Sequence, residues 1–174
     1  MEKSNKLYIM VGIPGSGKST WIANHKASFF KSYKIVSRDE IRFSLVTEDE
    51  EYFSKEQEVF STFVNYIKEG LREGFDVYAD ATHLNQSSRS KLLRALGEDL
   101  KGIKVEAIVI NVLVETAIRQ NANRTGRSFV PASAIKRMAS SFTIPSIEEG
   151  FDKIWIYDNE KNTTNRYTVY EREV

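Results

Sequence analysis

Residues 11–20 read VGIPGSGKST, and this stretch decides the fold. Positions 12–19 match the pattern G-x-x-x-x-G-K-[ST], in which a glycine-rich turn joins a strand to a helix and its backbone N–H groups surround phosphate oxygens. Residues 7–11 form a short apolar run that suits a buried strand, and a helix is expected over residues 18–25. The sequence therefore predicts a phosphate-binding loop between the first strand and the first helix.

This loop predicts binding of ATP, or another nucleoside triphosphate, together with Mg²⁺. Lys18 is expected to contact the β- and γ-phosphates and to act on the transferred group, and Ser19 is expected to hold the metal ion. The positive end of the following helix adds to the attraction for phosphate. The residues expected to bind the nucleotide here are Gly12, Pro14, Gly15, Ser16, Gly17, Lys18, Ser19 and Thr20.

Predicted strands and helices alternate through most of the chain. The expected strands cover residues 7–11, 33–36, 75–80, 103–114, 153–158 and 166–173. The expected helices cover residues 18–25, 39–46, 52–71, 86–96 and 115–122, with a further helix starting at Val130-Pro131. The polar stretch 159–165 is expected to turn between the last two strands. This alternation predicts an α/β protein with a parallel central sheet and helices on both faces. Together with the phosphate-binding loop, the small size of the chain favours a three-layer P-loop kinase fold.

Length and composition suit one domain that spans residues 1–174. The chain is 41% hydrophobic and has no cysteine, which excludes a disulfide framework, a thiolate metal site and a cysteine nucleophile. No apolar run approaches the roughly 18 residues of a membrane span, and the charged start does not resemble a secretory signal. We therefore expect a cytoplasmic protein of a bacterium or a phage-infected host, with no membrane partner.

Charge is unevenly distributed along the chain. The net charge of +1 argues neither for nor against a nucleic-acid partner. Residues 116–140 carry basic but no acidic side chains, whereas residues 48–58 are strongly acidic. We expect the acidic stretch to form a helix whose charged side is a solvent-exposed face, and an assembly surface is the alternative. The sequence thus predicts a basic face offset by an acidic one, and it leaves the oligomeric state open.

A second motif, SRDEIR at residues 37–42, follows the second predicted strand. Ligands of open parallel sheets bind at the carboxyl ends of the strands, so this motif is expected beside the phosphate-binding loop. Asp39 can accept the proton of an incoming hydroxyl, and Arg42 lies on the same helix face and can bind a phosphate. The alternative is local, because Ser37 and Glu40 can form a capping box that only starts the helix.

A third group of polar residues lies in VYADATHLNQSSR, residues 77–89. Asp80 ends a predicted strand at the same edge of the sheet, where it can support Mg²⁺ or Ser19, although it can also be a plain turn or capping residue. Thr82 and Asn85 can line the acceptor site by hydrogen bonding, or they can serve turn formation alone.

A lid over the nucleotide is expected at about residues 119–131, which read RQNANRTGRSFVP. Arg124 and Arg127 flank a flexible Thr-Gly pair within it. Lid arginines can neutralise the charge that develops on a transferred phosphoryl group. A solvated basic loop is the alternative interpretation.

In their order and spacing, these four stretches resemble the 5′-hydroxyl polynucleotide kinases of the phage T4 type. The matching pieces are GIPGSGKSTW, SRDEIR, DATHLN and NRTGRSFVP followed by IKRM, which together span residues 10–138. The resemblance implies transfer of the γ-phosphate of ATP, with Mg²⁺, to the 5′-OH ends of DNA or RNA in nucleic-acid repair. It implies that Asp39 is the general base, that Arg42 contacts the acceptor phosphate and the reacting centre, and that Arg124 and Arg127 hold ATP.

The sequence departs from the family pattern at a few positions. His83 stands where the family often has asparagine, Gln120 stands where arginine is frequent, and one extra residue separates Arg127 from Val130. The chain has neither the D-x-D-x-[TV] motif of the family's phosphatase domain nor the K-x-D-G motif of a ligase. The resemblance therefore covers a kinase domain alone.

Three hypotheses of function follow. The first is a polynucleotide 5′-hydroxyl kinase that binds its strand through Arg38, Arg42 and Arg89, so that binding weakens with salt. The second is a P-loop kinase of a small hydroxylated molecule, such as a nucleoside, a nucleotide sugar or an antibiotic. The third is an ATP-binding module that changes conformation for a partner without transferring phosphate.

Overall fold

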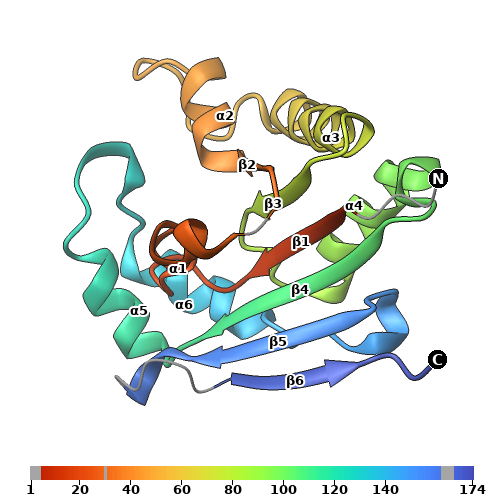
Figure 1. Cartoon of the computed structure of the whole chain (residues 1–174). Coiled ribbons are helices and arrows are strands. Elements are labelled where there is room, and N and C mark those ends of the chain that lie inside the picture. Colours follow the sequence, from red (N-terminus) through yellow and green to blue (C-terminus); the bar gives the residue numbers. More distant parts are fainter. Residues whose placement is uncertain (1–4, 30, 162–166) are drawn as a thin grey trace.

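A mostly parallel six-stranded sheet forms the centre of the molecule (Figure 1). The computed structural model describes residues 5–29, 31–161 and 167–174. The sheet has the order β2-β3-β1-β4-β5-β6, in which the first five strands are parallel and β6 pairs antiparallel with β5. The strands are β1 (Lys6–Val11), β2 (Tyr33–Ser37), β3 (Asp76–Asp80), β4 (Lys104–Asn111), β5 (Lys153–Asp158) and β6 (Tyr167–Glu171).

Helices connect the parallel strands, as crossover connections require. They are α1 (Lys18–His25), α2 (Arg38–Leu45), α3 (Glu56–Arg72), α4 (Gln86–Leu96), α5 (Val114–Asn121) and α6 (Ala132–Ser141). Short 3₁₀ turns are η1 (Lys26–Ser28), η2 (Gly97–Leu100), η3 (Gly126–Ser128), η4 (Ile147–Glu149) and η5 (Asn159–Lys161). The predicted α/β fold is confirmed, with the antiparallel β6 as the exception to a fully parallel sheet.

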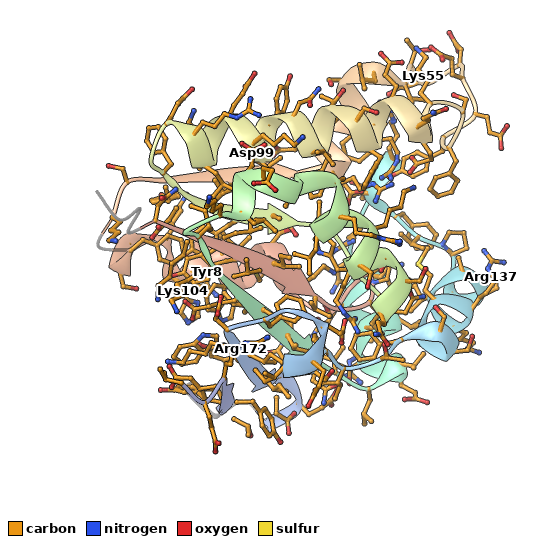
Figure 2. The ribbon with its side chains drawn as sticks, turned by 90° about the vertical axis from the view of Figure 1, so that its right-hand side faces the viewer. Tyr8, Lys55, Asp99, Lys104, Arg137 and Arg172 are labelled. Atoms are coloured by element: carbon orange, nitrogen blue, oxygen red, sulfur yellow. The ribbon has the colours of Figure 1, made fainter. Side chains whose placement is uncertain are left out.

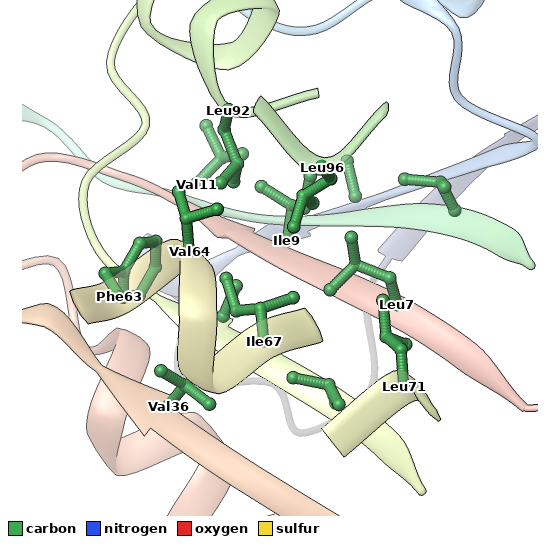
Figure 3. Packing of buried hydrophobic residues seen from close by; sticks show 14 of the residues in the cluster. Leu7, Ile9, Val11, Val36, Phe63, Val64, Ile67, Leu71, Leu92 and Leu96 are labelled. Carbon is green, nitrogen blue, oxygen red and sulfur yellow. The ribbon is translucent and has the colours of Figure 1, made fainter. Parts of the chain in front are cut away.

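The main core lies between one face of the sheet and helices α3 and α4 (Figure 3). Leu7, Ile9 and Val11 alternate along β1, and their side chains are fully buried against these helices. Phe63 and Ile67 project from α3 one turn apart, so they form the apolar stripe that covers the strands. This packing fixes β1, and therefore the loop that follows it.

Other packing holds the loop after β1 from its remaining sides. Ile22 of α1 packs against Met10 and Ile108 on the second face of the sheet. Ala117 of α5 and Ile135 of α6 form a separate cluster with Ile13 of the loop itself. Helices α1, α5 and α6 thereby position the phosphate-binding loop at the carboxyl edge of the sheet (Figure 1).

The acidic stretch at residues 48–58 differs from the sequence prediction. A helix is expected from residue 52, but residues 48–55 form turns and bends, and α3 begins at Glu56. Local side-chain bonds favour the turns, because Thr47 Oγ1 donates to Glu50 at 3.1 Å and Lys55 Nζ donates to the carbonyl of Leu45 at 2.7 Å. Lys55 lies at the upper end of the molecule in Figure 2. We call residues 46–55 the acidic turn segment. The other turn prediction, at residues 159–165, lies partly outside the described residues.

Candidate active site

The phosphate-binding loop, residues 12–17, has a backbone that requires glycine. Gly15 and Gly17 have φ values of 81° and 101°, which lie in the left-handed region. A Cβ atom on Gly15 would lie 2.3 Å from the carbonyl oxygen of Ala117. Ser16 Oγ is buried and has no hydrogen-bond partner within the described part of the chain. The loop thus offers a preformed cradle with an unsatisfied polar group, which fits phosphate oxygens.

Lys18 points its ammonium group back across this loop. Its Nζ donates to the carbonyl oxygens of Gly12 at 2.9 Å and Ile13 at 3.1 Å. Burial lowers the pKa of Lys18 to about 8, with the carboxylate of Asp80 opposing the shift and the guanidinium of Arg124 adding to it. Phosphate oxygens in the cradle would stabilise the charged amine, so Lys18 fits the phosphate-binding role.

Ser19 and Asp80 form a pair of oxygen ligands beside the loop. Ser19 Oγ donates to Asp80 Oδ2 at 2.8 Å. Burial raises the pKa of Asp80, although the charge of Lys18 and the hydrogen bond from Ser19 both act to lower it. A hydroxyl and a carboxylate are hard ligands of the kind that Mg²⁺ prefers, so these two residues would hold the ion directly or through water. The ion would neutralise charge on the transferring phosphate.

Asp39 lies in the first turn of α2 and faces a cavity. Ser37 caps this helix by accepting a bond from the backbone N–H of Glu40 at 3.3 Å, and Asp39 takes no part in the cap. The Asp39 side chain is 65% exposed, and its Oδ1 accepts a bond from Arg42 Nη1 at 2.7 Å. The local interpretation of the motif therefore explains Ser37 but leaves the carboxylate of Asp39 open to the cavity.

Arg42 is buried and is held by a residue that the sequence analysis missed. Its Nε and Nη2 donate to the two carboxylate oxygens of Glu56 at 2.5 Å and 3.0 Å, and the rings of Tyr52 and Phe53 lie 5.0 Å and 5.4 Å from its Cζ. Burial would lower the pKa of Arg42, but the bonds with Glu56 and Tyr52 raise it above its usual range. Burial would likewise raise the pKa of Glu56, yet Arg42 keeps it lowered. Arg42 is thus a fixed cation beside Asp39.

One cavity of about 580 Å³ joins these groups. Its lining comes from the phosphate-binding loop, the end of β3, α2, the start of α3, the segment predicted as a lid, and α6. It brings together Lys18, Ser19, Asp39, Arg42, Asp80 and Arg124. The cavity can therefore place a nucleotide phosphate and a second substrate next to each other.

The structure corrects the expected role of Arg89. Its side chain is fully buried, and it forms an ion pair with Glu149 at 2.7 Å and donates to the carbonyl oxygens of His83 and Thr143. A buried guanidinium with these partners cannot contact a polynucleotide. Arg89 instead ties α4 to the chain that precedes β5.

Of the remaining residues predicted to bind the acceptor, two line the cavity and one caps a helix. Asn85 does not line the cavity but caps α4, since its side chain accepts a bond from the backbone N–H of Ser88 at 3.0 Å. This corrects its expected role in the acceptor site in favour of turn chemistry. Arg38 and Thr82 do line the cavity. Arg38 pairs with Glu56 at 3.1 Å, and the carbonyl of Thr82 accepts a bond from the N–H of Gly12.

The two lid arginines have different surroundings. Arg124 lines the cavity and makes only a long 3.5 Å contact with the carbonyl of Ser128 among the described residues. Arg127 donates to the carbonyl oxygens of Phe43 and Val46 at the end of α2, and its Cζ lies 4.8 Å from the ring of Phe43. Both arginines line the cavity, but Arg127 also connects its segment to α2, whereas Arg124 has fewer protein partners among the described residues and is more open to a phosphate.

His83 holds the third motif against β1. It has a φ of 44°, which is uncommon for a residue other than glycine, and its Nδ1 lies 2.6 Å from the carbonyl oxygen of Met10. This contact places the proton on Nδ1, and burial lowers the pKa of the ring to about 4. A neutral imidazole thus fixes the turn that carries Thr82 next to the phosphate-binding loop.

A family model described as an AAA domain matches residues 7–145, and the chain belongs to this family. The fold and the site define a nucleotide-binding P-loop domain with a kinase-like fold. The chain is similar to "Transcription factor bHLH140" of Arabidopsis thaliana, with 23% identity over 169 residues. That match covers 94% of this chain and 17% of the Arabidopsis protein.

Solved structures agree with this class. A chain of the Pnkp1/Rnl/Hen1 RNA repair complex is similar with 26% identity and a TM-score of 0.60, over 79% of this chain and 43% of that one. A structure from Chloroflexus aurantiacus gives a TM-score of 0.71 at 12% identity, over 92% and 88% of the two chains, and this likeness shows the fold alone. Among the described helices, none has the length and apolar character needed to cross a bilayer.

Proposed function

We propose that this chain is an ATP-dependent polynucleotide 5′-hydroxyl kinase that transfers the γ-phosphate to 5′-OH ends of DNA or RNA in nucleic-acid end repair. One observation carries the proposal: the exposed carboxylate of Asp39 shares a cavity with the phosphate-binding loop and is bonded to the buried Arg42. A hydroxyl acceptor that carries a phosphate needs such a base and such a cation side by side. The likeness to the RNA repair complex supports a polynucleotide as the acceptor.

In this proposal one oxygen of Asp39 is fixed and the other is available. Oδ1 accepts the bond from Arg42, and Oδ2 has no hydrogen bond within the described residues. Oδ2 accepts the proton of the 5′-hydroxyl as that oxygen forms a bond to the γ-phosphorus, and ADP leaves with the electrons of the broken P–O bond. Lys18 and Arg124 neutralise the phosphate oxygens, and catalysis comes mainly from positioning and charge.

The wider proposal takes residues 1–174 as one kinase domain with a lid at about residues 119–131, acting in the cytoplasm. ATP is the donor, Ser19 and Asp80 are the residues for Mg²⁺, and Arg38, Arg42 and Thr82 face the acceptor.

Transfer of labelled γ-phosphate tests the proposal directly. The acceptors are 5′-OH DNA and RNA oligonucleotides, compared with nucleosides, sugars and nucleotide sugars. Asp39→Asn should lower the transfer rate about 100- to 10,000-fold, the usual contribution of a general base, while the Kd for ATP stays unchanged. Glu40→Gln removes the neighbouring exposed carboxylate and is the matched control.

Each other result argues against a different part of the proposal. Label that reaches only small molecules assigns the acceptor to the second hypothesis. ATP binding without transfer to any acceptor supports a conformational module. Undiminished transfer by Asp39→Asn removes Asp39 as the base.

A further inference from the structure

Two phenylalanine rings are exposed at the cavity that contains Asp39. Phe53 belongs to the acidic turn segment and is 55% exposed, and Phe129 belongs to the lid and is 47% exposed. Both residues line the cavity. Covering an exposed phenyl ring with a ligand is favourable, because it removes apolar surface from water. The two rings therefore suit an apolar part of the second substrate.

Phe53 stands next to the proposed reacting groups. Its ring packs edge-on against Tyr52, with centroids 4.8 Å apart and an interplanar angle of 83°, and it lies 5.4 Å from Cζ of Arg42. Arg42 in turn bonds to Asp39. The ring is therefore held in place by its neighbours while more than half of its surface stays open.

The same cavity also contains an exposed cation, Arg137. Arg137 of α6 lines the cavity, is exposed and projects from the ribbon (Figure 2). Within the described residues it forms no ion pair, whereas Arg38 and Arg42 share the charge of Glu56. Arg137 is thus a candidate partner for a further phosphate.

Three features of the cavity match three parts of one nucleotide. The Asp39 carboxylate suits a hydroxyl, the phenyl rings suit a flat heterocyclic base, and the arginines suit phosphates. The chemistry of the lining therefore favours an acceptor that carries a base.

We propose that Phe53 and Phe129 form a stacking subsite for the base of the terminal acceptor nucleotide, and that Arg137 binds a phosphate that follows it. This inference rests on the proposed function. Stacking tolerates all four bases, and the subsite therefore gives little sequence preference.

The test compares two single-stranded oligonucleotides that differ only in whether the 5′-terminal nucleotide, bearing the 5′-OH, carries a base or is abasic. With the base present, Phe53→Ala should raise KM for the oligonucleotide about 10- to 100-fold, as the loss of one stacking partner does, with KM for ATP unchanged. With the abasic end, wild-type and variant KM should agree. Phe53→Trp should keep the wild-type KM for the oligonucleotide, and Phe129→Ala should raise this KM by a smaller factor than Phe53→Ala.

Tyr66→Ala is the matched control, because Tyr66 is an exposed aromatic residue of α3 that does not line the cavity. Equal KM values of the wild-type protein for the base-bearing and abasic ends would overturn the stacking subsite and leave the proposed function intact. Absence of transfer to any oligonucleotide would instead remove the proposed function itself, and the subsite with it.

Discussion

Replacing Arg89 with alanine should strongly destabilise the protein without acting on substrate binding. The guanidinium is 0% exposed and donates five hydrogen bonds: two to the carboxylate of Glu149, two to Thr143 and one to the carbonyl of His83. The Glu149 side chain is itself only 4% exposed. Alanine would therefore leave a buried carboxylate without its cation and two carbonyl oxygens without their donor.

The expected size of the effect follows from this burial. Removing one partner of a buried ion pair costs about 3–5 kcal/mol, because the other charge stays desolvated. For a domain of this size each kcal/mol lowers Tm by about 2–4 °C, so Arg89→Ala should lower Tm by about 6–20 °C. Typical stabilities are about 5–15 kcal/mol, and the loss is therefore a large fraction of the whole.

Thermal unfolding followed by circular dichroism measures this effect. Arg94→Ala is the matched control, since Arg94 lies exposed on the same helix and should leave Tm within about 2 °C of wild type. The double variant Arg89→Met with Glu149→Gln should melt above Arg89→Ala, because it leaves no buried charge unpaired. A near wild-type Tm for Arg89→Ala, combined with a raised KM for oligonucleotides, would show that Arg89 binds the strand and that its ion pair with Glu149 contributes little to stability.

Two further predictions concern the lid and the third motif. Arg127→Ala should free residues 119–131 from the carbonyl oxygens of Phe43 and Val46, so limited proteolysis should cut this segment faster than in the wild-type protein. The exposed variant Lys136→Ala is the control, and unchanged cleavage of Arg127→Ala would contradict the link to α2. Burial lowers the pKa of His83 from an ordinary 6.5 to about 4, so between these pH values the unfolded state binds a proton that the folded state does not. The free energy of unfolding should therefore fall by about 3 kcal/mol as the pH drops from 6.5 to 4. In denaturant melts His83→Asn should lose this part of the pH dependence, and an equal fall in the variant would refute the assignment.

Local sequence patterns predicted the parts of the molecule that local chemistry determines. The glycine-rich loop requires positive φ at Gly15 and Gly17, and the pattern identified it together with the helix that follows at residues 18–25. The boundaries of α4 were also predicted, because Asn85 caps it and Gly97 ends it. These features depend on neighbours within a few residues, which a sequence displays directly.

Long-range contacts decided what the sequence could not show. Arg89 reads as one more surface cation until Glu149, far away in the chain, is seen to bury it. Glu56 reads as one of several acidic residues, and only the packing of α2 on α3 reveals its bonds to Arg42. The turns at residues 48–55 arise from side-chain bonds that compete with a helix, and periodicity does not register them.

Glu56 bears on how Arg42 would act on Asp39 in the proposed function. Glu56 accepts hydrogen bonds from Nε and Nη2 of Arg42, while Nη1 donates to Asp39 and Tyr52. Without Glu56 the guanidinium would be free to pair with both oxygens of Asp39, as arginine–carboxylate pairs often do, and this closer pairing would make the carboxylate a weaker base. Glu56 thus limits Arg42 to a single bond with Asp39, and this leaves Oδ2 to accept the proton of the acceptor hydroxyl that we propose.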